Sequence, residues 1–483
     1  MLSGSVLHPY QDWGGDFAGY ILQARSIAED GVSSFVSASR FVVENSTSQS
    51  FAPVTYPWGF PLLLAPAYAL FGLDMIALKC VPLLFHLLLL ALLWFGFAPY
   101  HPGPWRIALV ALFAFNPYLL TFLNRILSDV PFLFFSTLTV LVMVRIVVDR
   151  RRIISPAGDA ILLGTLLAAS FFIRSNGALL LPTLLFVQLI RSRQAPRTRK
   201  TVRPDTFLPY VWFALCLIVW RALFPNESGP SVNVFTHASL YTIKRNILFY
   251  WQAPADFFLG FPVPRVLFIA TFPLLLVGAW KRRGRDYPIV VYSVLTALLY
   301  VAWPYTQGLR YAMPLLPFFV SFTLSGLQGA QPSARERARV GSMAARLLPA
   351  MIVLFFMGRA TIGMAWEARG GIEAIPPGPY QKASRELFSY VRDETPTESV
   401  ILFFKPRVML LYTGRRSLLI DRPELLDRGD YLCIYPAREG QDQLSAPEVD
   451  RCLLGGLLEP VYENSAFRLY RVLEREVPAD DRS

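Results

Sequence analysis

The chain has 483 residues, of which 54% are hydrophobic and 17% charged, and its formal net charge is +12. Soluble domains are about one quarter charged, so this composition excludes an ordinary water-soluble enzyme, and an aromatic content of 14% excludes a disordered chain. The charge is uneven, because 16 Lys and Arg face 20 Asp and Glu from Ala365 onward, a net charge of −4. The pattern predicts an α-helical polytopic membrane protein with a water-soluble C-terminal domain.

Residues 1–74 precede the first clear membrane span. Asp16–Asp30 has apolar residues at helical spacing and is followed by Gly31, a frequent C-cap residue, so it predicts an amphipathic helix. Tyr56–Phe71 is apolar but short, and it either spans the membrane or only dips into it. The net charge of −4 over this region favours an extracytoplasmic location. We therefore expect that a first transmembrane helix is missing before Met1; the alternative is that Tyr56–Phe71 spans and the N-terminus is cytoplasmic.

Ten further apolar segments are candidates for membrane spans, each of which needs roughly 20 helical residues. They are Met75–Ala98, Arg106–Phe122, Ser128–Val148, the two halves of Ala157–Ile190 on either side of the polar break at Arg174–Asn176, Phe207–Phe224, Pro264–Trp280, Tyr287–Trp303, Tyr311–Leu327 and Leu347–Met364. With Tyr56–Phe71 included, the sequence predicts ten to eleven spans.

Four basic clusters orient these spans. They are Arg150–Arg152, Arg191–Arg203, Lys281–Arg285 and Arg335–Arg346, and with the acids at their edges they carry a net charge of +14. An even number of predicted spans separates each cluster from the next, so all four lie on the cytoplasmic side. We therefore predict an extracytoplasmic first loop (1–74), a transmembrane core (75–364) and an extracytoplasmic domain (365–483). The basic charge follows the membrane topology and does not indicate a nucleic-acid partner.

Few polar residues lie near the predicted membrane midplane. Of the Asp, Glu, Lys, Arg and His residues in the spans, His86 alone lies in a central third. Lys79 and four arginines lie near a membrane face, where their long side chains can reach the interface. His86 is expected to be a helix-contact residue rather than a proton relay. Ion-coupled transporters place charges near the midplane, so this distribution argues against one.

The polar residues of interest gather on the predicted external side. They are Asp12, Asp16, Tyr20, Arg125, Asp129, Arg174, Asn176, Lys244, Arg245, Arg310 and Tyr311. Acids, bases and aromatic rings just above a membrane suit chemistry on a lipid-linked anionic substrate. Asp16 and Asp129 have an alternative interpretation, since each begins a predicted helix and could serve only as its N-cap.

Several motifs in this order resemble the GT-C type polytopic glycosyltransferases, a class that includes protein O-mannosyltransferases and lipid A aminoarabinose transferases. Asp16–Tyr20 resembles the acidic first-loop motif of that class, and Thr55–Leu63 resembles the aromatic and proline-rich stretch that ends the loop, with Trp58 in place of a proline. Leu127–Pro131 resembles its second acidic motif, and Arg310-Tyr311 with two following prolines resembles a late Arg-Tyr-x-x-Pro element.

The resemblance implies an enzyme of a bacterial inner or plasma membrane that moves a sugar from a polyprenyl-phosphate donor to an extracytoplasmic acceptor, with inversion. It implies Asp16 as the general base, with Asp12 in reserve. Asp129 would assist the base or hold a divalent cation such as Mg²⁺ or Mn²⁺, and Arg310 with Lys244 or Arg245 would bind the lipid phosphate. Tyr20, Arg125, Arg174, Asn176 and Tyr311 are expected substrate-binding residues. The alternative function is a lipid or oligosaccharide flippase or transporter without glycosyl transfer.

The C-terminal region alternates predicted helices and strands, which favours a small α/β domain. Tyr380–Glu394 and Pro447–Leu454 are expected helices, and Val400–Phe404, Ser417–Ile420, Tyr431–Tyr435, Pro460–Tyr462 and Phe467–Val472 are expected strands. We expect this domain to shape the acceptor site or to support the membrane core. A disulfide between Cys433 and Cys452 is left open.

Overall fold

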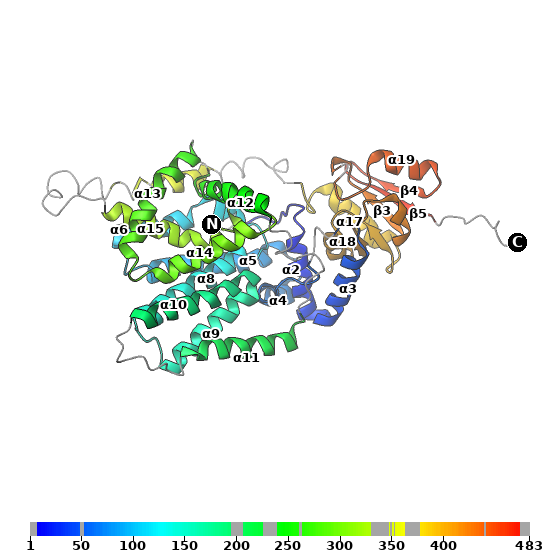
Figure 1. Ribbon diagram of the computed structural model, residues 1–483. Helices are drawn as coiled ribbons and strands as arrows, with labels where there is room; N and C mark the ends of the chain where they lie inside the picture. Colours follow the sequence, from blue (N-terminus) through cyan, green and yellow to red (C-terminus); the bar gives the residue numbers. More distant parts are fainter. Residues whose placement is uncertain are drawn as a thin grey trace. The chain divides into compact units, whose positions relative to one another are not determined.

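The computed structural model divides the chain into two compact units (Figure 1). A helical unit contains Met1–Leu7, Lys79–Phe224 and Asn233–Gly370, and a mixed unit contains His8–Leu78, Pro225–Val232 and Gly371–Ser483. The structure describes residues 7–48, 53–194, 206–225, 239–259, 263–329, 347, 350–351, 353–362, 377–438 and 441–473. The predicted basic cluster Arg335–Arg346 and most of Arg191–Arg203 lie outside the described residues.

The helical unit has a helix in each apolar segment that the sequence singled out. Its α-helices are α5 (Met75–Gly96), α6 (Gly103–Ala114), α7 (Pro117–Leu123), α8 (Asp129–Met143), α9 (Pro156–Ile173), α10 (Leu180–Gln194), α11 (Leu208–Leu223), α12 (Leu240–Gln252), α13 (Pro264–Arg282), α14 (Tyr287–Ala302) and α15 (Leu316–Gly329). Shorter helical segments are η2 (Val144–Val148), η3 (Ser175–Leu179), η6 (Ala253–Phe258), η7 (Gly308–Arg310) and η8 (Met313–Leu315), and an apolar helix covers Val353–Ile362.

Four helical stretches among the described residues are long and apolar enough to cross a membrane: Met75–Gly96, Asp129–Val148, Pro156–Ile173 and Pro264–Arg282. A fifth is added if α6 and α7, which meet at a bend of 51°, form one span. The remaining apolar helices have 10–17 residues. By length and composition the described chain therefore has four or five clear spans, fewer than the ten to eleven that the sequence predicts.

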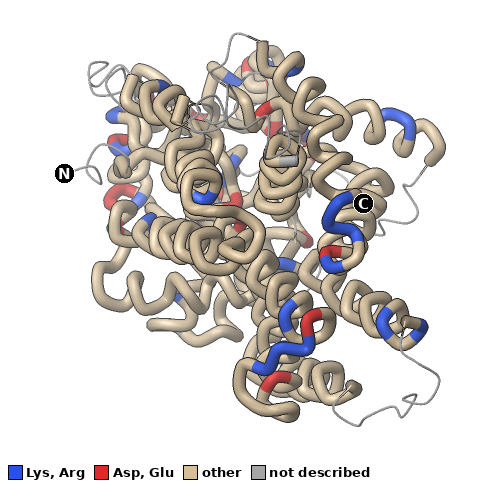
Figure 2. The backbone as a smooth tube through the Cα atoms, turned by 90° about the vertical axis from the view of Figure 1, so that its left-hand side faces the viewer, with Lys and Arg blue, Asp and Glu red and all other residues tan. Residues whose placement is uncertain are grey.

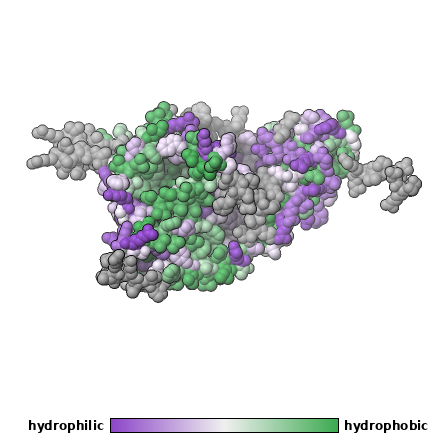
Figure 3. All heavy atoms as spheres, in the orientation of Figure 1, coloured by the Kyte–Doolittle hydropathy of each residue, from purple (hydrophilic) through white to green (hydrophobic). Residues whose placement is uncertain are grey.

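The surface of the helical unit is apolar in the way expected of a protein in contact with lipid. Figure 2 shows Lys and Arg mainly at helix ends and in loops, and Figure 3 shows a largely hydrophobic face over this unit. The exposed apolar side chains include Val211, Leu215 and Ile218 of α11 and Val266, Ile269, Leu276 and Trp280 of α13. Apolar surface on this scale is rare on soluble monomers and typical of membrane or protein interfaces.

Two sequence expectations inside the helical unit have different outcomes. The polar break is confirmed, because α9 ends at Ile173, Arg174 has an extended backbone, and a separate helix follows from Leu180. Lys79, expected near a membrane face, has a side chain that is fully buried in the fold. A buried lysine in an apolar helix is costly and marks a position of functional interest.

Helices α13 and α15 pack closely because glycines face each other's backbone. A Cβ atom added to Gly278 would lie 1.9 Å from the carbonyl oxygen of Phe322, and one added to Gly326 would lie 2.1 Å from that of Leu274. Small residues permit this approach of two backbones in membrane helix pairs. The contact holds α13, and with it the start of α14, in a fixed position.

We expect Gly326→Ala to destabilise the fold by about 1–3 kcal/mol, because the new methyl group must separate two backbones. Gly358→Ala is the matched control, since a Cβ at this other helical glycine meets nothing within 4 Å. The measurement is the thermal unfolding midpoint in detergent. Equal midpoints for the two variants would contradict the packing described.

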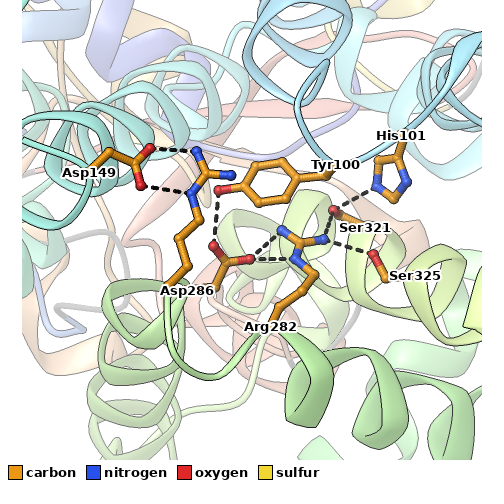
Figure 4. A network of polar contacts seen from close by, with 8 residues as sticks. Tyr100, His101, Asp149, Arg282, Asp286, Ser321 and Ser325 are labelled. Atoms are coloured by element: carbon orange, nitrogen blue, oxygen red, sulfur yellow. Dashed lines mark hydrogen bonds and ion pairs between the residues drawn. The ribbon is translucent and has the colours of Figure 1, made fainter. Parts of the chain in front are cut away.

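A buried polar network joins the turn between α13 and α14 to three other segments (Figure 4). Arg282 donates to Asp286 (2.5 Å) and to two serine hydroxyls of α15 (2.8 and 2.9 Å), and Tyr100 donates to the other oxygen of Asp286 (2.9 Å). Arg285 donates two hydrogen bonds to Asp149 (2.8 and 2.5 Å). Two residues of the predicted cytoplasmic cluster Lys281–Arg285 are therefore used to hold the helix ends together.

The mixed unit contains a five-stranded sheet of order β2-β1-β3-β5-β4. Its strands are β1 (Val400–Leu402), β2 (Arg416–Leu418), β3 (Tyr431–Ile434), β4 (Leu458–Glu463) and β5 (Arg468–Val472). β1 is parallel to β2 and β3, whereas β5 is antiparallel to β3 and β4. The helical elements are α2 (Asp16–Arg25), η1 (Ser26–Asp30), α3 (Val32–Asn45), α4 (Gly59–Phe71), α17 (Lys382–Glu394), α18 (Pro406–Thr413), η11 (Pro423–Arg428), η12 (Pro436–Arg438) and α19 (Ala446–Leu454). The small α/β domain and the five predicted strands are confirmed, and α18 is a helix that the sequence analysis missed.

The N-terminal segment of this unit is anchored on the C-terminal domain. Trp13 is buried against five aromatic rings of that domain, from Phe388, Phe403, Phe404, Tyr435 and Phe467, with ring centroids 5.1–6.5 Å away. Further along, Thr47 donates its backbone N–H to the carbonyl oxygen of Leu419 (2.9 Å). The segment that carries Asp16 is therefore held at both ends by residues of the C-terminal domain, more than 370 positions later in the chain.

The two cysteines of the C-terminal domain are free and buried. Cys433 lies in β3 and Cys452 in α19, and neither forms a disulfide. Burial raises the pKa of the Cys433 thiol well above its ordinary value, so it remains a protonated core residue.

Candidate active site

Asp129 lies at the start of α8, buried between two arginines that are distant in sequence. Arg310 Nε donates to both carboxylate oxygens (2.9 and 3.0 Å), and Arg174 Nη1 donates to Oδ1. Ser128 is the N-cap residue, and no side-chain hydrogen bond caps this helix. The N-cap interpretation of Asp129 is therefore wrong, since its carboxylate binds guanidinium groups instead of the helix's own backbone.

The break between α9 and η3 brings a second polar side chain to the same region. Asn176 Nδ2 donates to the hydroxyl of Tyr300, and the Tyr300 ring stacks on Tyr311 with centroids 4.5 Å apart. Arg174 and Asn176 are two residues apart at the break, and Arg310 and Tyr311 are adjacent in the loop before α15. Each of the two loops thus supplies one arginine that binds Asp129 and one residue that contacts Tyr300.

A cavity of about 530 Å³ opens beside this cluster. It is lined by Pro117, Tyr118, Thr121, Phe122, Arg125, Leu259, Gln307 and Arg310. Arg310 therefore joins the cavity to Asp129, and Gln307 accepts a hydrogen bond from Arg310 Nη1 (3.1 Å). With Arg125 and Arg310 in its wall, together with tyrosine and phenylalanine rings, the cavity has the charge and shape to hold an anionic group attached to an apolar or sugar moiety.

The remaining predicted cations, Lys244 and Arg245, lie on α12, a helix that the sequence analysis did not predict. Asn246 is fully buried and donates to the carbonyl oxygens that end α14, including that of Trp303 (2.6 Å). Arg245 donates to the carbonyl oxygen of Pro304 (2.8 Å), and Lys244 is exposed. The structure places Arg245 at the end of α14 that leads to Arg310, and it records no contact of either cation with Asp129.

The surroundings of Asp129 do not fit a divalent cation. Mg²⁺ and similar ions need several carboxylate, carbonyl or water oxygens. Both oxygens of Asp129 instead accept hydrogen bonds from guanidinium groups, and the described residues contain no group of three or more His, Cys, Asp or Glu side chains suited to a metal. The two arginines outweigh the single carboxylate in charge, which favours an anion.

Asp16 is the first residue of α2 in the mixed unit, where it pairs with the aromatic stretch that ends the first loop. Its Oδ1 accepts a hydrogen bond from the hydroxyl of Tyr56 (2.9 Å). Gly15 holds the N-cap position, so the N-cap interpretation of Asp16 is also wrong. Burial of the Tyr56 hydroxyl, and next the adjacent Asp16 carboxylate, raise the pKa of Tyr56 well above its ordinary value. Tyr56 therefore stays protonated and acts as a donor to Asp16.

Tyr56 is held in place by the same face of α2. Gln23 is fully buried, and its side-chain amide exchanges two hydrogen bonds with the backbone of Tyr56, each of 3.0 Å. Tyr20 packs on the Tyr56 ring with centroids 4.6 Å apart. Asp16, Tyr20 and Gln23 follow one another at i, i+4 and i+7, so all three lie on one helix face. Gln23 was missed by the sequence analysis, although this spacing could have identified it.

Two basic residues of the C-terminal domain lie near this part of the first loop, Arg407 at Tyr56 and Lys405 within electrostatic reach of Asp12 and Asp16. Arg407 is buried, and its guanidinium carbon lies 5.0 Å from the centroid of the Tyr56 ring. Lys405 lies 4.0 Å from Asp442, and burial lowers its pKa while the carboxylates of Asp442, Asp16 and Asp12 oppose this shift. Neither residue was a sequence candidate, because both belong to the start of α18, a helix that was not predicted.

The predicted site residues thus fall into two groups. The mixed unit holds Asp16 and Tyr20 around Tyr56. The helical unit brings Asp129, Arg174 and Arg310 into direct contact, places Arg125 in the cavity wall with Arg310, and links Asn176 to Tyr311 through Tyr300.

The fold is similar to those of known membrane glycosyltransferases, although no protein-family model and no curated protein sequence matches the chain. ArnT from Cupriavidus metallidurans bound to undecaprenyl phosphate aligns over 98% of this chain and 96% of its own, with 11% identity and a TM-score of 0.61. The same protein in the apo state aligns over 96% and 95%, with 12% identity and a TM-score of 0.60. The Archaeoglobus fulgidus oligosaccharyltransferase in complex with Zn and sulfate aligns over 88% of this chain and 66% of its own, with 11% identity and a TM-score of 0.55. The chain therefore has the fold of the GT-C type polytopic glycosyltransferases that its sequence resembles.

Proposed function

We propose that the protein is a membrane glycosyltransferase that moves a sugar from a polyprenyl-phosphate donor to an extracytoplasmic acceptor, with inversion at the anomeric carbon. The cavity beside Arg310 is the observation that carries this proposal. It has two arginines and several aromatic or apolar side chains in its wall, in a fold that in ArnT accepts undecaprenyl phosphate. A cationic cavity of this kind suits a lipid phosphate better than a neutral lipid.

Asp16 is the proposed general base. The acceptor hydroxyl attacks the anomeric carbon, the new oxygen–carbon bond forms as the bond to the phosphate oxygen breaks, and the hydroxyl proton passes to the Asp16 carboxylate. The electron pair of the broken bond leaves with the lipid phosphate. Tyr56 donates a hydrogen bond to Asp16 Oδ1 and so orients the carboxylate that receives the proton.

Arg310 and Arg125 are the proposed ligands of the lipid phosphate, with Lys244 or Arg245 of α12 contributing from the neighbouring loop. Cationic groups stabilise the negative charge that develops on a departing phosphate. Asp129 assists by holding Arg310 and Arg174 in position, and Tyr20, Asn176 and Tyr311 contribute to binding the sugar or acceptor. No step in this scheme uses a metal ion, because the contacts of Asp129 do not fit one.

The proposed topology has ten or eleven spans in the inner or plasma membrane of a bacterium, with residues 1–74 and 365–483 outside the cytoplasm. Even numbers of predicted spans between the basic clusters support it. We expect a cysteine introduced at exposed Arg392, in a background without native cysteines, to react with a membrane-impermeant maleimide in intact spheroplasts. A cysteine at exposed Arg283, in the cytoplasmic cluster, should react only after the membrane is opened. The reverse pattern would contradict this topology.

The proposed function is tested with purified protein in liposomes, supplied with a panel of undecaprenyl-phosphate sugars and a membrane extract as the acceptor source. We expect at least one donor to be consumed, with transfer of its sugar to an extract component. An arm without extract, with the donor in one leaflet only, measures movement of the lipid across the bilayer. Movement without any sugar transfer would favour the flippase and contradict the proposal.

A further inference from the structure

Arg407 and the candidate base Asp16 belong to the same compact unit. It lies at the second position of α18, in the C-terminal domain, and its side chain is only 5% exposed. One of its terminal nitrogens donates to the backbone carbonyl oxygen of Pro53, three residues before Tyr56. The guanidinium group faces the Tyr56 ring at 5.0 Å, a distance typical of a cation–π contact. Arg407 thus contacts both the backbone before Tyr56 and the ring of Tyr56.

Helix α2 also confines Tyr56. A Cβ atom added to Gly19 would lie 2.6 Å from the Tyr56 ring and 3.2 Å from the Arg407 guanidinium, so only glycine leaves room for this arrangement. Gln23 fixes the Tyr56 backbone with two hydrogen bonds. Tyr56 is therefore held by Gln23 of α2 and contacted by Arg407, and its hydroxyl donates to Asp16.

We propose that Arg407 is a positioning residue for the Asp16 base, which it serves by fixing Tyr56, so that the C-terminal domain forms part of the catalytic apparatus. This inference rests on the proposed function, in which Asp16 accepts the proton. It predicts that Arg407 affects the rate of the chemical step and leaves donor binding unchanged, because Arg407 contacts Tyr56 and Pro53 and has no proposed contact with the donor.

Arg415 provides a matched control in the same domain. It follows α18, is also buried, and donates to the backbone carbonyl oxygens of Arg392 (2.7 Å) and Thr395 (2.8 Å). Its contacts lie within the C-terminal domain and do not include Tyr56 or Asp16. If Arg407 had only the structural role of a buried arginine, Arg407→Met and Arg415→Met would therefore have the same effect.

The kinetic test compares full-length Arg407→Met, Tyr56→Phe, the double variant and Arg415→Met with the wild type. We expect Arg407→Met to lower kcat between about 10-fold and 100-fold with little change in the donor KM, the effect of a misplaced catalytic group. Because Arg407 acts through Tyr56, the double variant should lose no more than the more severe single variant. Arg415→Met that remains folded should keep the wild-type kcat. A normal kcat for Arg407→Met, or losses that multiply in the double variant, would overturn the inference.

Two further arms keep the inference testable. Arg407→Lys retains the cation and the side-chain stem, so it should fold even if Arg407→Met does not, and should recover part of the lost kcat. If the wild type transfers no sugar, the proposed function fails. The positioning of Asp16 is then tested by the extent to which a carbodiimide labels its carboxylate. Labelling should rise in Arg407→Met or Arg407→Lys and in Tyr56→Phe but not in Arg415→Met; unchanged labelling of Asp16 would contradict a positioning role.

Discussion

Asp16→Asn is expected to lower kcat by at least about 100-fold, the range that a general base contributes, while the protein still folds and inserts into the membrane. Asparagine keeps the size of the side chain and can still accept the Tyr56 hydrogen bond, but it cannot take a proton from the acceptor hydroxyl. Asp16 is only partly buried, so the amide of the variant keeps access to solvent. The measurement is kcat at saturating donor, together with the thermal unfolding midpoint.

Asp12→Asn is the control for this prediction. Asp12 lies four residues earlier in the same segment, and its Oδ1 accepts a hydrogen bond from the backbone N–H of Gly14 (2.9 Å). We expect the Asp12 variant to keep most of its activity. If Asp12→Asn were inactive and Asp16→Asn active, the reserve assignment of the base would be correct and the present one wrong.

Asp129→Ala is expected to destabilise the helical unit by about 3–5 kcal/mol, because removing one partner of a buried ion cluster leaves the others uncompensated. Arg174 and Arg310 have side-chain exposures of only 18% and 17%, so solvent screens them weakly. Arg310 would also lose its orientation toward the cavity, and donor binding should weaken with it. The measurements are the free energy of unfolding in detergent and the affinity for undecaprenyl phosphate.

The double variant Asp129→Ala/Arg310→Met tests whether charge is the cause. It leaves one guanidinium where the single variant leaves two, so it should be more stable than Asp129→Ala alone. It should still bind undecaprenyl phosphate poorly, because a proposed phosphate ligand is gone. A double variant that is less stable than the single one would indicate that shape, rather than charge compensation, holds this cluster together.

Local signals in the sequence were enough to predict most elements of both units. The strands of the C-terminal domain were found from short apolar and aromatic runs, and the break at Arg174–Asn176 was found from its polar residues. α12 was not predicted, because the sequence analysis considered its residues Lys244 and Arg245 only as cations. α18 was missed because it has only eight residues, although Pro406 at its first position is a frequent start signal.

The partners of the candidate site residues could not be predicted from the sequence. Arg310 is 181 residues from Asp129, and no periodicity links an arginine in one loop to a carboxylate in another. The motifs identified Asp129 and Arg310 only as external polar residues. Asp129 was therefore assigned as a metal ligand and Arg310, separately, as a phosphate ligand. Their direct contact replaces the metal interpretation with an ion cluster. Arg407 lies still further from Tyr56 in the chain and became a candidate only through their contact.

The most direct test of the central claim is the release of undecaprenyl phosphate from an undecaprenyl-phosphate sugar, measured by mass spectrometry for the wild type and Asp16→Asn side by side. We expect the wild type to release the lipid phosphate from at least one donor when acceptor extract is present, and Asp16→Asn to release it at least about 100-fold more slowly. Consumption of no donor by the folded wild-type protein, or equal rates for the two proteins, would contradict it.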